Sequence, residues 1–189
     1  MKRLFNYQNG EINLILNEPP LLRDYPDSLR EEQFSRPAYP ISNTYLVGLE
    51  LKVHTGGRMC YGLLAAQVEP CERRDSIMIS VAYTPGNTVR YKNSLLTDDR
   101  YVYKGLPEEY MEFVMNRIRM AITEQERCPQ CRISFLYAAN CEVGSSPMLF
   151  GIIAEIIIKI ICTGSINELP GMDQEAFTER YIKQYHILR

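Results

Sequence analysis

The sequence predicts an α+β fold, a two-layer sandwich with the element order β-β-β-α-β-α followed by a C-terminal helix. Apolar residues at helical spacing predict helices over residues 107–127 and 146–163. The run 131–139 lies between these helices and is apolar on both faces, which is typical of a central strand. Alternation with a period of two predicts three earlier strands, over residues 45–54, 61–70 and 76–83.

Residues 1–40 show little regular patterning. Residues 12–16 fit one short strand, but prolines interrupt the segment repeatedly, at Pro19, Pro20, Pro26, Pro37 and Pro40. We therefore expect an extended N-terminal arm over residues 1–40 that lies on a domain formed by residues 41–165.

Short turns separate the first three predicted strands, which favours an antiparallel meander. The first turn, in the stretch HTGGRMCYG (54–62), lies between two strands and lacks the G-x-x-x-x-G-K-[ST] spacing of a P-loop. A Gly-Gly hairpin turn is therefore the preferred interpretation, and we expect no nucleotide-binding site.

The polar segment 84–105 is long for a loop inside a compact domain, which is typical of functional or mobile segments. Alternation on either side of NSLLTDD predicts a projecting hairpin. Its basic and aromatic side chains suit RNA, by phosphate contact and stacking, and equally suit a solvated hairpin whose tyrosines pack across the strands. The candidate RNA-binding residues are Arg90, Tyr91, Lys92, Arg100, Tyr101, Tyr103 and Lys104.

Both predicted helices have recognisable starts. Pro107 suits the first position of one helix, whereas Ser146 suits the N-cap of the other with Pro147 at its first position. The second helix contains Glu155 and Lys159, a favourable i,i+4 pair. Its apolar run is shorter than the ~20 residues that a membrane span needs, so we expect a buried helix and no membrane contact.

Residues 166–189 predict an amphipathic helix that packs on the domain and buries Phe177, Tyr181, Tyr185 and Leu188. The 189 residues are 46% hydrophobic and 23% charged, as in ordinary globular domains. The net charge of −2 gives the chain no overall attraction for nucleic acid. Because no apolar signal segment follows the first residues, we expect a cytoplasmic protein with reduced cysteines.

Cys128 and Cys131 form a C-x-x-C motif, which is typical of half a zinc site or of a redox pair. A zinc site would recruit Cys141 or one of the two histidines, His54 and His186. A redox pair would open a helix, whereas this motif leads into a predicted strand. Two small residues in a helix–strand turn are the preferred interpretation, and we expect no metal, no cofactor and no enzymatic activity.

Three motifs, taken in order, resemble domain IV of elongation factor G. TGGRMCYGLLAAQVEP (55–70) is similar to the Gly-Gly-Arg-Gly-Gln-Tyr-Gly stretch that opens that domain. LPEEYMEFVMNRIRMAI (106–122) is similar to its Pro-Lys-Glu-Tyr helix, and NCEVGSSPMLFGIIAEII (140–157) to its His-Asp-Val-Asp-Ser-Ser stretch and following helix. The segment 131–150 also resembles the tetracycline ribosomal-protection proteins. The resemblance extends over residues 41–163.

This resemblance implies a ribosomal protein S5 domain 2-like fold with a left-handed βαβ crossover. It also implies a tRNA-mimicking arm whose tip loops reach the decoding centre of the small ribosomal subunit. Cys60 stands where the family has glutamine and Cys141 where it has the tip histidine, and thiols hydrogen-bond RNA poorly. Unlike the whole elongation factor, this sequence has no P-loop, so we do not expect a GTP-driven translocase. The positions that match the family's tip are Gly57, Arg58, Cys60, Tyr61, Cys141, Ser145 and Ser146.

Three functional hypotheses follow. The first is a non-enzymatic, translation-factor-like domain that binds the ribosome or its RNA through the tip loops. The second is a protein-interaction or scaffold module that binds a protein partner or a second copy of itself. The third is a metal or redox site at the tip, formed by Cys60 and Cys141 with Cys128 or Cys131 nearby.

Overall fold

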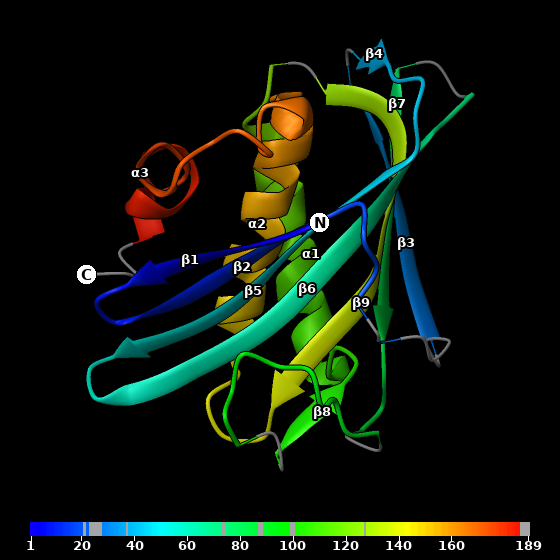
Figure 1. The fold of residues 1–189 in the computed structure, drawn as a ribbon. Helices are drawn as coiled ribbons and strands as arrows, with labels where there is room; N and C mark the ends of the chain where they lie inside the picture. Colours follow the sequence, from blue (N-terminus) through cyan, green and yellow to red (C-terminus); the bar gives the residue numbers. More distant parts are fainter. Residues whose placement is uncertain are drawn as a thin grey trace.

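The computed structural model describes residues 1–20, 22, 28–36, 38–72, 75–86, 89–98, 101–126 and 128–185. Nine strands in this part of the chain form one sheet, and two long helices with a C-terminal helical segment cover one of its faces (Figure 1). The predicted α+β class is confirmed.

The chain enters the sheet at its first residues and leaves it after the last strand. The strands are β1 (Lys2–Tyr7), β2 (Gly10–Leu16), β3 (Ser28–Ser35), β4 (Ala38–Pro40), β5 (Tyr45–Thr55), β6 (Arg58–Pro70), β7 (Ser76–Tyr83), β8 (Val102–Lys104) and β9 (Cys128–Cys141). The helices are α1 (Glu108–Thr123), α2 (Pro147–Cys162) and α3 (Gln174–Phe177), and further helical turns span Ser165–Asn167, Thr178–Ile182 and Lys183–Tyr185. The strand order is β1-β2-β5-β6-β9-β7-β3, and β4 and β8 also pair with β9.

Strand β9 lies between β6 and β7, so the predicted meander of β5, β6 and β7 is wrong for its last strand. β9 pairs antiparallel with β6 and parallel with β7, and α1 connects β7 to β9. β9 is buried along most of its length, as the apolar run 131–139 predicted for a central strand. A strand that is apolar on both faces takes a central place because neighbouring strands and both face layers then cover it.

The prediction of an extended arm over residues 1–40 is wrong, because four strands of this segment join the sheet. β1 and β2 form a hairpin beside β5, β3 pairs with β7 at the opposite edge, and β4 pairs with the start of β9. Ile12, Leu14 and Leu16 point to the helices and are fully or almost fully buried. Pro19 and Pro20 follow β2, where the missing N–H groups cost no ladder hydrogen bond.

α1 and α2 run parallel to each other on the sheet. Near their starts the Tyr110 hydroxyl donates to the main-chain oxygen of Ser145 at 3.2 Å. Near their ends Lys159 lies 3.9 Å from Glu124. Gly151 permits the close packing, because a Cβ there would lie 2.8 Å from side-chain atoms of the neighbouring helix.

The predicted start of α2 is confirmed: Ser146 is the N-cap, and its Oγ accepts a 3.3 Å hydrogen bond from the Leu149 N–H. Pro107 is the N-cap of α1 rather than its first helical residue. Lys159 donates to Glu155 at 2.8 Å, as the i,i+4 spacing predicted. In the described part of the chain, no helix combines the length and hydrophobicity needed to cross a membrane.

The C-terminal helical segment packs on β1. The Phe177 ring stacks on Phe5 with centroids 5.1 Å apart, and the Tyr7 and Thr178 hydroxyls are 2.8 Å apart. Tyr181 is buried and Tyr185 is half-buried, whereas Leu188 lies outside the described residues. This segment therefore covers the helix-side face of the hairpin that residues 1–16 add to the sheet.

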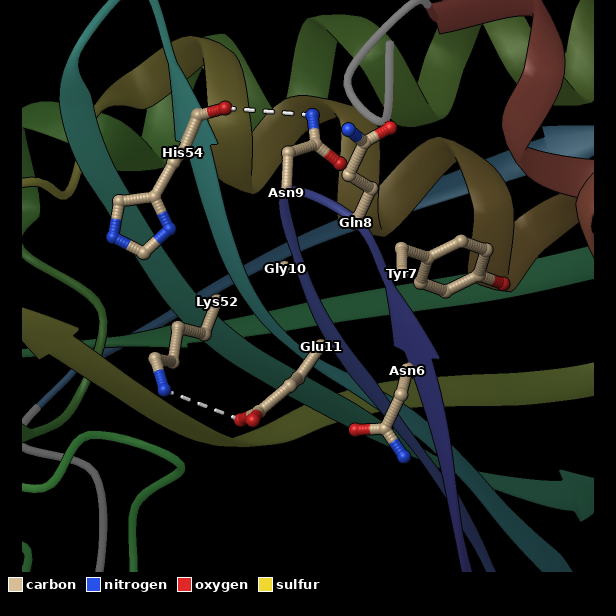
Figure 2. Close-up of a pocket in the computed structure, with 8 residues that line it drawn as sticks. All are labelled: Asn6, Tyr7, Gln8, Asn9, Gly10, Glu11, Lys52 and His54. Atoms are coloured by element: carbon tan, nitrogen blue, oxygen red, sulfur yellow. Dashed lines mark hydrogen bonds and ion pairs between the residues drawn. The ribbon is translucent and has the colours of Figure 1, made fainter.

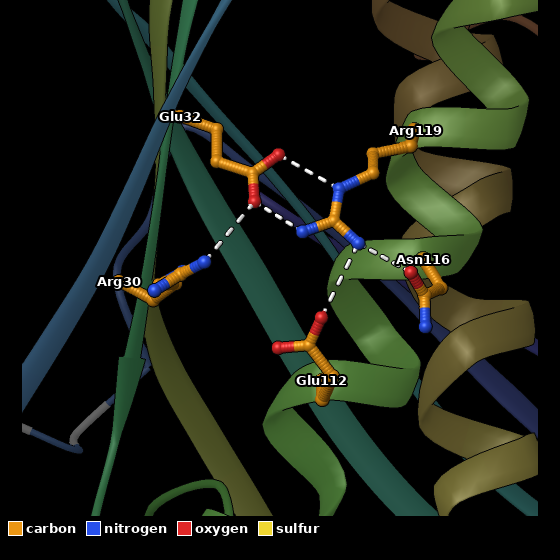
Figure 3. Close-up of polar contacts among 5 residues, drawn as sticks. All are labelled: Arg30, Glu32, Glu112, Asn116 and Arg119. Atoms are coloured by element: carbon orange, nitrogen blue, oxygen red, sulfur yellow. Dashed lines mark hydrogen bonds and ion pairs between the residues drawn. The ribbon is translucent and has the colours of Figure 1, made fainter.

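Edge strand β3 is connected to α1 by charged side chains (Figure 3). Both oxygens of Glu32 accept hydrogen bonds from Arg119, which also contacts Asn116 and Glu112 on its own helix. Arg30 lies 3.8 Å from Glu32. Charged residues on an exposed edge strand also oppose pairing with a second sheet.

Candidate functional site

Two loops that are far apart in the sequence meet at one end of the sheet. β5 and β6 form a hairpin with its turn at residues 56–57, and the loop after β9 spans residues 142–146. Because β6 and β9 are antiparallel, with Gly62 opposite Asn140, the start of β6 and the end of β9 lie at the same end. We call this the tip end, defined by residues 54–60 and 141–146.

The β5–β6 turn has the hairpin geometry that the sequence predicted. Gly56 and Gly57 have φ values of 58° and 77°, so both central residues are in the left-handed region that a type I′ turn requires. A Cβ added to either glycine would meet no atom within 4 Å apart from its neighbours in sequence. Gly57 and Arg58 are therefore exposed at the outermost point of the hairpin.

Ser145 fastens the second loop to β6. Its Oγ accepts a 2.7 Å hydrogen bond from the Cys141 N–H and donates a 2.6 Å hydrogen bond to the main-chain oxygen of Tyr61. The Tyr61 N–H in turn donates to the main-chain oxygen of Gly144 at 3.1 Å. Ser145 and Ser146 are thus engaged in holding the loop and capping α2.

Two of the predicted contact residues, Tyr61 and Cys141, are buried on the sheet face opposite the helices. The Tyr61 hydroxyl donates a 2.9 Å hydrogen bond to the buried carboxylate of Glu50. Burial, followed by the Glu50 charge, raises the pKa of Tyr61, and burial raises the pKa of Cys141. These side chains support the tip end from within and do not present a contact surface.

The described residues 89–91 and 102–104 pair antiparallel, as the predicted hairpin requires, but the described part of the segment 84–105 lies against the sheet and does not project from it. Arg90 bridges to Tyr103, and β8 pairs with the end of β9, which places the segment at the tip end (Figure 1). From there it crosses the face opposite the helices, where the Leu95 N–H donates to Glu50 on β5 at 2.8 Å. Tyr91 is 2% exposed in this cluster, so the prediction that it stacks on RNA is wrong.

Several predicted residues of this segment are nonetheless at the surface. Arg90 and Lys92 are exposed, Tyr101 is 50% exposed, and Lys104 is half-buried. Arg100 lies outside the described residues. Among the residues that the structure describes, no ion pair includes Arg58, Arg90 or Lys92. The tip end and the adjoining segment therefore present three exposed cations.

The cysteines do not form the predicted tip site. Cys60 packs on the helix-side core, whereas Cys141 belongs to the cluster on the opposite face. Cys128 and Cys131 lie at the other end of β9, and even Cys131, the nearer of the two, is ten residues and therefore roughly 33 Å from Cys141 along an extended strand. Within the described residues no group of three or more Cys, His, Asp or Glu side chains could hold a metal ion.

The β1–β2 turn adds polar residues beside the tip end that the sequence patterns did not predict. The Asn9 amide donates to the His54 main-chain oxygen at 3.4 Å, and the His54 N–H donates to the Asn9 main-chain oxygen at 2.6 Å. The central residues of this turn are Gln8 and Asn9, since Tyr7 pairs with Gly10, and neither has a positive φ, so the Asn9-Gly10 dipeptide does not occupy the positions that an Asn-Gly hairpin signal requires. An open pocket of about 240 Å³ lies here (Figure 2), lined by Asn6, Tyr7, Gln8, Asn9, Gly10, Glu11, Lys52 and His54.

No family model and no curated protein matches this sequence. The solved crystal structure of a protein from Thermus thermophilus is similar, with a TM-score of 0.44 and 18% sequence identity. The match covers 76% of this chain and 18% of that chain, so this sequence spans less than a fifth of the other protein's length. At this identity the likeness concerns the fold alone.

Proposed function

We propose that this protein is a non-enzymatic domain that binds RNA through its tip end, in the manner of a translation-factor arm on the ribosome. We also propose that its fold is the ribosomal protein S5 domain 2-like fold of domain IV of elongation factor G. The parallel β7–α1–β9 unit, the two parallel helices on one face and the pair of adjoining loops support this assignment.

The observation on which the proposal rests is the placement of Arg58, Arg90 and Lys92. All three side chains are exposed and lie at the end of the sheet where the two loops meet. None of the three forms an ion pair among the described residues, so each can contact phosphate oxygens, and each such contact releases condensed counterions from the nucleic acid. Tyr101, in the same segment as Arg90 and Lys92, is 50% exposed, and an aromatic ring at the surface is the kind of side chain on which an unpaired base stacks.

The remaining tip residues have different roles in this proposal. Ser145 and Tyr61 hold the 142–146 loop against β6, so they fix the distance between the two loops. Gly57 keeps the hairpin turn tight enough for the main chain to approach a phosphate closely. In this proposal the exposed cations and the main chain of the tip end recognise the RNA. Cys60 and Cys141 replace the glutamine and histidine of the family, but this replacement removes neither the cations nor the main-chain groups. Binding to ribosomes would place the protein in the cytoplasm.

Co-sedimentation with ribosomes, and fluorescence anisotropy with a labelled single-stranded RNA, test this proposal. The wild-type protein is expected to bind at low salt and to dissociate as the salt concentration rises. Replacing Arg58, Arg90 and Lys92 together by alanine should weaken binding and reduce the slope of log K against log salt by about 2, since each single-strand phosphate contact contributes about 0.7.

A matched control removes the same number of charges elsewhere, at Arg132, Arg180 and Lys183, which are exposed and belong neither to the tip end nor to the segment 84–105. This triple variant should bind like the wild type. Equal loss of binding in the two triple variants would show that only net charge matters. Absence of any binding at low salt would overturn the proposal.

A second candidate is a protein-interaction module, and two exposed apolar side chains, one in the tip end and one just after it in α2, favour it. Val143 is 74% exposed and Met148 is 62% exposed, and the carboxylates of Glu108, Glu109 and Glu142 are exposed near them. Val143→Lys distinguishes the two candidates. An added cation should strengthen RNA binding, whereas it should weaken an apolar contact with a protein partner or a second copy of this chain.

A further inference from the structure

Two buried cysteines that are distant in the sequence lie against each other at the end of the sheet opposite the tip end. The Cys162 thiol donates to the Cys128 Sγ, and the two sulfur atoms are 3.4 Å apart. Cys128 is the first residue of β9 and Cys162 is the last residue of α2. Both are free thiols with 0% and 7% exposure.

We propose that Cys128 and Cys162 are an oxidisable thiol pair, and that a hydroperoxide converts them to a disulfide that joins the start of β9 to the end of α2. The C-x-x-C motif in the sequence points instead to Cys128 and Cys131. The thiol contact in the structure identifies Cys162 as the partner, because the sulfur atoms need move only about 1.4 Å closer to reach the disulfide bond length.

The surroundings of the pair favour Cys128 as the sulfur that reacts first. The hydrogen bond from Cys162 and the positive charge of Arg36 lower the pKa of Cys128 against the opposing effect of burial. The hydrogen bond to Cys128 and burial raise the pKa of Cys162. The Nε of Arg36 is buried and has no hydrogen-bond partner. A negative charge on Cys128 would therefore be attracted by a cation whose own hydrogen-bonding capacity is not fully used. A thiolate is the nucleophilic form of cysteine.

The oxidation proceeds in two balanced steps. The Cys128 thiolate attacks one oxygen of hydrogen peroxide, an S–O bond forms, the O–O bond breaks, and the departing hydroxide takes up a proton to become water. Cys162 loses its proton and attacks the resulting sulfenic sulfur. The S–S bond forms, the S–O bond breaks and a second water leaves, so two thiols are oxidised and one peroxide is reduced.

Strand β4 covers this pair and controls access to it. Ala38 is the register partner of Cys128, and the Tyr39 hydroxyl donates to the Cys162 main-chain oxygen at 3.1 Å. β4 has three residues, and short edge elements with few hydrogen bonds open at lower cost than the rest of a sheet. Tyr39→Phe removes one of these contacts and should increase the oxidation rate.

The test treats the intact protein with hydrogen peroxide, blocks the remaining thiols under denaturing conditions, and maps disulfide-linked peptides by mass spectrometry. The expected product has lost two hydrogens, retains four of its six thiols, and links the Cys128 peptide to the Cys162 peptide. Cys128→Ser and Cys162→Ser should each abolish the linkage, whereas Cys131→Ser and Cys60→Ser should preserve it.

A second measurement is independent of the variants' stability. Oxidised wild-type protein should unfold at a higher temperature than reduced protein, because the new bond restricts the unfolded chain, and a thiol reductant should reverse the shift. A Cys128–Cys131 or Cys71–Cys131 bond as the main product would overturn the proposal. So would the absence of any disulfide in protein whose edge strands are opened by mild denaturant.

Discussion

The main-chain N–H of Leu95 donates a 2.8 Å hydrogen bond to the Oε1 of Glu50 on the sheet face opposite the helices. The segment that contains Leu95 enters the sheet through β8, beside β9, whereas Glu50 is on β5. The segment therefore crosses β9 and β6 to reach its anchor. Asn13 and Tyr61 donate to the same carboxylate at 3.2 and 2.9 Å, so one buried acid organises three parts of the chain.

Glu50→Leu is expected to release this segment and to destabilise the fold. Leucine leaves the Tyr61 hydroxyl, the Asn13 amide and the Leu95 N–H without their acceptor, at a cost on the order of 3 kcal/mol in the free energy of unfolding. Glu50→Gln retains an accepting oxygen and should preserve the fold. Urea unfolding measures the stability, and hydrogen exchange at Leu95 reports whether the segment is released. Equal exchange in the leucine variant and wild type would contradict the anchoring role.

The stability conferred by Glu50 should depend on pH in a defined direction. Burial raises the pKa of the Glu50 carboxyl, and the hydrogen bonds offset this only in part. The folded state therefore binds this proton more tightly than the unfolded state does. The resulting gain in the free energy of unfolding is largest below the unfolded-state pKa of about 4.3, and it is lost as the pH rises through the folded-state pKa. Glu50→Gln does not titrate, so wild type should lose stability relative to this variant as the pH rises. A difference that stays constant from acid to neutral pH would be the contrary result.

Local patterns predicted the strands and helices of residues 41–165 well. The alternation in 45–54 places Val47, Leu49 and Leu51 on one face, and all three are buried under the helices. Ser146 with Pro147 marks the start of α2 correctly. Both signals, the alternation within a strand and the capping residues at a helix start, involve residues close together in the sequence, so they can be recognised without the structure.

Pairing between distant segments was not predictable in the same way. The insertion of β9 between β6 and β7 follows from burial on both faces, but no local pattern specifies its neighbours. Tyr91 follows an arginine, as the exposed Tyr101 does, and only the folding of its segment across the sheet buries it. The contact between Cys128 and Cys162 likewise joins residues 34 positions apart.

Arg119 and Glu32 should show a measurable coupling across the space between α1 and β3. The guanidinium contacts both carboxylate oxygens, a geometry that adds to the attraction, although partial exposure of both side chains screens it. A double-mutant cycle with Arg119→Ala and Glu32→Gln is expected to give a coupling free energy of about 1 kcal/mol in urea unfolding. The same cycle on Lys183 and Glu179, which are exposed, should give less. Equal coupling in the two pairs would contradict this assignment.

Gly48→Ala should destabilise the centre of the sheet. A Cβ on Gly48 would lie 2.3 Å from the Cβ of Ala65, its register partner on β6, and 3.0 Å from a main-chain oxygen. Relief of this overlap requires the two strands to separate, at an expected cost of 1–3 kcal/mol, roughly the range for overpacked sites. Gly86→Ala is the matched control, because a Cβ there meets no atom within 4 Å and should change stability little. Similar unfolding midpoints for both variants would exclude the predicted overlap.

At Gly57 the cost of a left-handed backbone conformation can be measured without a steric clash. Its φ of 77° disfavours any side chain, yet the surrounding space is open. Gly57→Val should therefore cost about 1–2 kcal/mol through the left-handed backbone alone. Gly57→Asn should cost less, because asparagine tolerates this region through local hydrogen bonding. If the tip end binds RNA, the valine variant should also bind more weakly at temperatures where it is fully folded, since a shifted turn displaces Arg58. Full binding by a folded valine variant would show that Arg58 does not depend on the turn for its position.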